Sequence, residues 1–123
     1  MMLDLTGDEA RLLLNVALMA TGQNRFRSAA KILAALERFR PGEASIAVAN
    51  AILRISMLDF QGAVDYIDRE GLPRFPHSAM LKAFKGMALL RMNRADAARV
   101  SLSEAAADTV DPAAAQLARD LMT

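Results

Sequence analysis

The chain has 123 residues, enough for one domain, and its 15 basic and 14 acidic residues give a net charge of +1. This balance argues against binding to nucleic acid or to an anionic membrane, which needs a basic excess on one face. Without cysteine the chain can form neither disulfides nor thiolate metal sites, and it fits a reducing compartment. No 18-residue run lacks charge and no cationic stretch precedes an apolar core at the start, so we expect neither a transmembrane helix nor a secretory signal.

The first third of the chain predicts a pair of helices. Thr6 and Glu9 have the spacing of a capping box ahead of an apolar run, which indicates a helix from Thr6 to about Thr21, ended by the next glycine. A second helix is predicted from about Asn24 to just before Pro41, because apolar residues recur there at three- and four-residue spacing.

The middle third predicts a second pair. The segment Glu43–Met57 is apolar on nearly every face, which is typical of a buried helix. Asp59 is a good N-cap for the next helix, which we expect to end at Gly71. An irregular connection then follows as far as Pro76.

The last third predicts three helices. The first runs from His77 or the following serine to Met92, and the second from Asn93 to about residue 108. The third has Asp111 as N-cap and Pro112 at its first helical position. A stack of helical repeats needs a terminal cap, and this last helix fits that role.

A repeated alanine organises these helices. Ala29, Ala63 and Ala97 follow one another at intervals of 34 residues, the period of the tetratricopeptide repeat (TPR). Each stands early in a predicted second helix, where a small residue lets two helices cross closely. An aromatic residue precedes each of the first two alanines by three positions, as Phe26 and Phe60, and Arg94 takes that position in the third repeat.

The sequence therefore predicts an all-α fold, a TPR-like superhelix of three antiparallel helix hairpins plus a C-terminal capping helix. We expect one domain over residues 1–123, with repeats at about 10–41, 44–76 and 78–110 and the capping helix at 112–122.

The concave face is the expected binding surface, because the first helix of each repeat lines it in a TPR. When the three repeats are aligned on Ala29, Ala63 and Ala97, the residues on this face are mostly aliphatic. We therefore expect this face to bind the apolar face of a helix rather than a free carboxylate. The alternative is that another helix of this chain, such as the last one, packs there; otherwise an exposed apolar patch needs a partner. The predicted groove residues are Leu14, Leu18, Thr21, Val48, Ile52, Ile55 and Leu89, with Lys82 and Gly86 in the same register.

The sequence shows no catalytic constellation. His77 is the single histidine, so it can build neither a zinc site nor a Ser-His-Asp triad, and the glycines are too scattered for a phosphate loop. We therefore predict a protein that is not an enzyme and has no metal or cofactor. Asn50 and Arg54 share one face of an otherwise apolar helix, where they either hydrogen-bond a partner or mark a solvent-exposed stripe.

Several stretches resemble a known family. Residues 14–23, 28–33, 53–57 and 60–63 look like the first two hairpins of the TPR-like chaperones of bacterial type III secretion. The resemblance covers residues 10 to about 100, and it is nearest to the chaperone that, with a short helical co-chaperone, holds the needle subunit before export. It implies a cytoplasmic bacterial chaperone whose concave face holds the amphipathic C-terminal helix of that subunit. The chain departs from the family in lacking aromatic residues in the groove.

Two functions remain open from the sequence. The first is an export chaperone that sequesters an amphipathic helix of a secreted subunit, with or without a small co-chaperone. The second is a TPR scaffold or adaptor within a larger complex, without a chaperone role. When the partner is absent, we expect a homodimer through the same apolar face to replace it.

Overall fold

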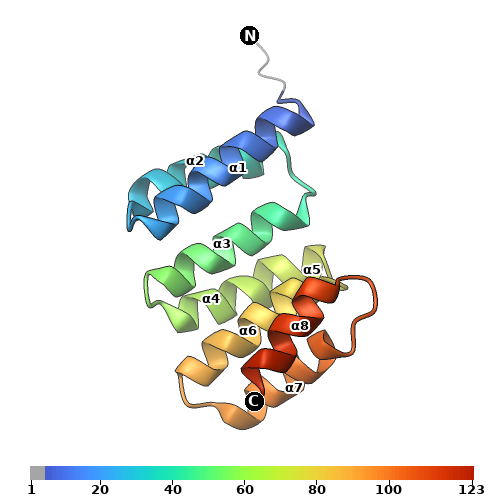
Figure 1. Cartoon of the computed structure of the whole chain (residues 1–123). Helices are drawn as coiled ribbons and strands as arrows, with labels where there is room; N and C mark the ends of the chain where they lie inside the picture. Colours follow the sequence, from blue (N-terminus) through green and yellow to red (C-terminus); the bar gives the residue numbers. More distant parts are fainter. Residues whose placement is uncertain (1–4) are drawn as a thin grey trace.

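The computed structural model describes residues 5–123, and this part of the chain is all-helical, without a β-strand. The described residues form seven continuous helical segments. The helices follow one another from α1 and α2 at one end of the molecule to α6 and α7 at the other, and α8 lies beside α6 and α7 (Figure 1). They form antiparallel helix hairpins followed by one more helix, which confirms the predicted all-α, TPR-like hairpin fold. No helix in this part of the chain is long and apolar enough to cross a membrane.

The first hairpin consists of α1 (Gly7–Gly22) and α2 (Phe26–Phe39). The capping box expected from the sequence is present: the backbone N–H of Glu9 donates to the Thr6 hydroxyl at 3.1 Å, and the N–H of Thr6 donates to the Glu9 carboxylate at 3.2 Å. Two of the orphan donors at the start of α1 are thereby satisfied.

The second hairpin consists of α3 (Ala44–Ser56) and a composite helix. The composite helix begins as α4 (Phe60–Tyr66), widens into the π-helical turn η1 (Ile67–Gly71) and ends as the short α5 (Leu72–Arg74). The prediction that this helix ends at Gly71 was therefore wrong. Pro73 lacks an N–H and would clash with a carbonyl four residues back in a regular helix, and the wider turn immediately before it relieves that conflict.

The third hairpin consists of α6 (Ala79–Arg91) and α7 (Ala95–Ala106), and α8 (Pro112–Leu121) packs on both of its helices. The carboxylate of Asp111 accepts from the N–H of Ala114 at 3.1 Å and so caps α8 as the sequence indicated. The outer side of α8 exposes Gln116, Arg119 and Asp120 to solvent, as the outer face of a capping helix should.

Each hairpin turn contains one residue in the left-handed region. These residues are Asn24, Leu58 and Asn93, with φ of 62°, 63° and 61°. In every turn the following N–H donates to a carbonyl five residues back, at 2.8–2.9 Å, which is the closing bond of a Schellman motif. The first two turns are 34 residues apart, but the second and third are 35 apart.

Because of this extra residue, the third alanine at a helix crossing is not the one predicted from the sequence. Ala29, Ala63 and Ala98 are all fully buried, whereas Ala97 is exposed, so the crossing residue of the third hairpin lies one position later than predicted. The insertion lies in the composite helix Phe60–Arg74, which is one residue longer than α2. A π-helical turn encloses one residue more than an α-helical turn, so it absorbs the insertion without breaking the helix.

Candidate functional site

An apolar groove lies where the sequence places the concave face. Leu14 and Leu18 of α1 and Val48 and Ile52 of α3 line it, and its volume is about 370 Å³. All four side chains are half-buried, so they reach the surface without being fully covered. The remaining lining residues are Ala44, Ser45, Ala49, Ser78, Met80 and Asp111.

The repeat explains why these four side chains meet. Leu14 and Val48 are 34 residues apart, as are Leu18 and Ile52, so they hold equivalent positions in the first two repeats. Within each helix the two residues are four apart and therefore share one face. Because α3 packs on both α1 and α2, the two faces lie side by side.

Three predicted groove residues lie elsewhere. Thr21 is only 3% exposed, and its hydroxyl donates to the carbonyl of Ala17 at 2.9 Å. Leu89 is 4% exposed within the core between α6, α7 and α8. Ile55 is half-buried and packs against that same core. The structure therefore does not bring these three to the groove with the four residues above.

The part of α6 that was expected in the groove faces α7 instead. Gly86 is buried so closely against α7 that a Cβ there would lie 2.4 Å from side-chain carbons of Leu102. Lys82 reaches Glu104 of α7 at 3.5 Å, and its carbonyl accepts from the Ser101 hydroxyl at 2.6 Å. The 34-residue register misplaced these residues because the second repeat has 35.

Sequence reasoning missed the residues at one end of the groove. Ser78 and Asp111 are the N-caps of α6 and α8, and Met80 lies in the first turn of α6. Both capping residues could be recognised from the sequence, and first helices of successive repeats run parallel. The starts of these helices should therefore lie at the same edge, so the capping residues themselves were the signal for this end of the groove.

The C-terminal helix leaves the aliphatic part of the groove open. Helix α8 packs against α6 and α7 and reaches the groove with Asp111 at its start. In the described chain, the last helix therefore does not fill the part of the groove that lies between α1 and α3.

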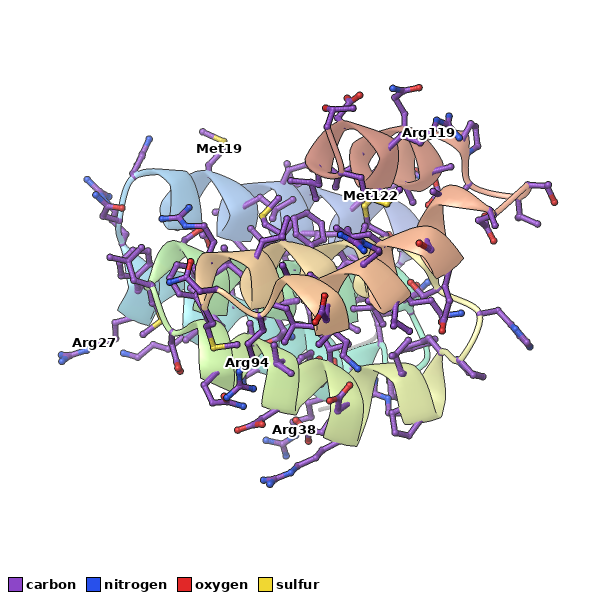
Figure 2. All side chains as sticks on the ribbon, turned by 90° about the horizontal axis from the view of Figure 1, so that it is seen from below. Met19, Arg27, Arg38, Arg94, Arg119 and Met122 are labelled. Atoms are coloured by element: carbon purple, nitrogen blue, oxygen red, sulfur yellow. The ribbon has the colours of Figure 1, made fainter. Side chains whose placement is uncertain are left out.

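A second apolar surface lies on the other side of α1. Leu12, Val16 and Met19 are 64%, 42% and 62% exposed and share one face of the helix. Met19 points away from the stacked helices (Figure 2). Leu12 is two residues from Leu14, which places it about 200° around the helix axis, so this surface is separate from the groove.

The polar face of α3 is turned away from the groove. Asn50 donates to the carbonyl of Ile46 at 3.1 Å, and Arg54 donates to the carbonyl of Asn50 at 3.1 Å. The Arg54 guanidinium also lies over the ring of Tyr66, 4.3 Å from its centre. Both residues are half-buried, as the groove residues are, so this polar face is partly exposed to solvent on the side of α3 opposite the groove.

Within residues 5–123, no three histidine, cysteine, aspartate or glutamate residues gather as a metal site would require, and His77 is exposed in the connection before α6.

Comparisons with protein families, with curated proteins and with solved structures found no match.

Proposed function

We propose that this protein is a cytoplasmic bacterial chaperone that binds another protein rather than a substrate for catalysis. Its client is an amphipathic helix of a subunit exported by type III secretion, held in the concave groove. The observation that carries the proposal is the aliphatic strip of Leu14, Leu18, Val48 and Ile52, which borders an open groove between two parallel helices.

The chemistry of the strip suits the apolar face of a helix. Four branched aliphatic side chains from α1 and α3 offer apolar surface worth about 25 cal/mol for each Å² buried, before the cost of association. Burial of the client's apolar face would keep a self-polymerising subunit soluble until export. Because this attraction is apolar, binding should be insensitive to salt, in contrast to capture by lysine side chains.

One experiment compares two charges on the same helix. Leu18→Glu places a carboxylate in the groove, and Leu12→Glu places the same group on the opposite side of α1, where Leu12 is 64% exposed. With a client that co-purifies from the native cell and is identified by mass, we expect Leu18→Glu to weaken binding at least tenfold and Leu12→Glu to leave it unchanged. Circular dichroism controls for folding. A folded Leu18→Glu variant that binds normally would remove the groove from the mechanism.

The scaffold function keeps one observation in its favour. The surface of Leu12, Val16 and Met19 at the α1 end of the stack is a second exposed apolar area, as expected of a subunit held in a larger assembly. The solubility of the client, compared with and without this protein, separates the two functions, because a chaperone keeps its client in solution and a scaffold does not. Loss of the interaction in Leu12→Glu, with Leu18→Glu unaffected, would favour the scaffold.

The client-free protein offers a further test. With the groove empty we expect homodimers at high concentration, together with fluorescence from a dye that binds exposed apolar surface. The Leu18→Glu change should reduce both signals. A strict monomer that binds no dye would argue against an open apolar groove.

A further inference from the structure

The outer side of the stack carries a second cleft, separate from the groove. It has a volume of about 500 Å³ and lies between α2 and α4, with α3 as its floor. On α3 the cleft is lined by Asn50 and Arg54, each two residues from a groove residue and therefore about 200° around the helix from Val48 and Ile52. A ligand in this cleft would not touch the groove.

One end of the cleft is apolar and the other is polar. The apolar end is formed by small and aliphatic side chains of α2 and α3, and Asp59, the N-cap of α4, also borders the cleft. The polar end gathers Glu37 of α2, Arg54 of α3, and Tyr66, Glu70 and Arg74 of the composite helix. Arg74 donates to Oε1 of Glu37 at 2.6 Å, which ties the end of the composite helix to α2. The apolar residues are Ala30, Leu33, Ala34, Leu53 and Met57.

Two oxygen atoms of the polar end are buried without a hydrogen-bond partner among the described residues. They are Oε2 of Glu37 and the hydroxyl of Tyr66. Tyr66 is only 8% exposed, and burial, followed by the Glu37 charge, raises the pKa of its phenol to about 12. A buried polar atom left without a partner costs about 1–3 kcal/mol, so both atoms would gain from a partner. They have almost no exposed surface, so a group in the cleft reaches them only when the two side chains turn toward it.

The charges at this end select the kind of group. Two carboxylates, Glu37 and Glu70, stand beside two guanidiniums, Arg54 and Arg74, so the four charges balance. Because these four charges balance, net charge favours neither a cation nor an anion, and a charged group would lose its hydration without a net Coulomb gain. A neutral amide has one N–H for the orphan carboxylate oxygen and one C=O for the phenol hydroxyl.

We propose that this outer cleft binds a neutral amide group, whose N–H donates to Oε2 of Glu37 and whose carbonyl accepts from the Tyr66 hydroxyl. The ligand extends an apolar portion over Ala30, Leu33 and Ala34. A polypeptide supplies such a group either as a side-chain carboxamide or as a backbone amide.

Small probes of equal size test the chemistry on the full chain. Propionamide, propionate and propylammonium differ in charge and hydrogen bonding but hardly in shape. Tyr66 is the single tyrosine and the chain has no tryptophan, so tyrosine fluorescence reports directly on the cleft, with backbone amide NMR shifts as a second readout. We expect a saturable change with propionamide, and binding of propionate and propylammonium about tenfold weaker. N-methylpropionamide then distinguishes the two sources, since only a backbone-type site accepts a secondary amide.

Matched variants complete the test. Glu37→Gln replaces the orphan acceptor by a donor, and Tyr66→Phe removes the hydroxyl; each should weaken propionamide binding about tenfold. Glu104→Gln, an exposed carboxylate on α7 outside the cleft, should leave it unchanged. Circular dichroism verifies folding, and Tyr66→Phe is read by NMR. The proposal is overturned if propionamide gives no saturable change, which would mean that water alone fills the cleft. Equal affinity for the three probes, or binding unaffected by both cleft variants, would overturn it as well.

Discussion

The crossing of α6 and α7 provides the sharpest test of the repeat register. Ala98 is fully buried among side chains of the C-terminal core, and Ala97, its neighbour in the chain, is exposed. The same substitution at these two positions therefore probes opposite environments within one helix. We expect Ala98→Leu to destabilise the protein and Ala97→Leu to be nearly neutral.

The magnitude follows from the packing at the crossing. Leucine adds three carbon atoms at Ala98, where no surface is exposed and the two helices are already close: the Ser101 hydroxyl reaches the Lys82 carbonyl at 2.6 Å. Overpacking of this kind costs about 1–3 kcal/mol. With an unfolding entropy of about 2.1 cal/mol/K per residue, the melting temperature should fall by about 4–12 °C. At Ala97 the change should stay within about 0.5 kcal/mol, because leucine and alanine have similar helix propensities and nothing crowds the site.

Urea denaturation followed by circular dichroism at 222 nm measures both variants, with equal m-values as the sign that the unfolded state is unaffected. Ala63→Leu serves as the positive control, since Ala63 is fully buried at the preceding crossing and should lose a similar free energy of unfolding. A loss at Ala97→Leu that equals or exceeds the loss at Ala98→Leu would refute the 35-residue second repeat and restore a strict 34-residue period.

Three further predictions concern single sites. Leu58 holds a left-handed conformation with φ of 63° and is 68% exposed, so Leu58→Asn should stabilise the protein by about 1 kcal/mol and raise the melting temperature by about 4 °C in a thermal scan. Gly86→Ala should cost about 1–3 kcal/mol in urea denaturation despite the better helix propensity of alanine, because the new methyl group meets Leu102; unchanged stability would show that α6 and α7 can separate. The pKa of Tyr66 is raised to about 12, so its contribution to stability is complete below pH 10 and is lost as the pH rises from 10 to 12. A pH titration of the Tyr66 phenol, followed by absorbance at 295 nm, should show a midpoint near 12. The midpoint should be lower in the Glu37→Gln variant, which removes the neighbouring negative charge. A midpoint near 10 in the unmodified protein would contradict the burial of Tyr66.

The groove was predictable as far as the repeat was regular. Leu14, Leu18, Val48 and Ile52 follow from an exact 34-residue offset between α1 and α3, together with the four-residue spacing that places two side chains on one helix face. The prediction failed for Leu89, because no local signal marks a single-residue insertion within a helix.

The amino-acid sequence by itself determined the local structure. The capping box of Thr6 and Glu9 and the N-caps Asp59 and Asp111 act within a few residues, so the chain starts its helices there whatever surrounds them. The 34-residue spacing likewise identified the hairpins, because each hairpin makes most of its contacts between neighbours in the chain.

Only the tertiary structure decided which faces meet. The π-helical turn at Ile67–Gly71 shifts all later side chains by one residue, about 100° around a helix axis, and this moves burial from Ala97 to Ala98. The outer cleft joins Glu37 to Tyr66 and Arg74 across 29 and 37 positions of the chain, and no periodicity relates such residues. The unpaired oxygen atoms of Glu37 and Tyr66 depend on how two hairpins pack, which is a property of the whole stack rather than of any one helix.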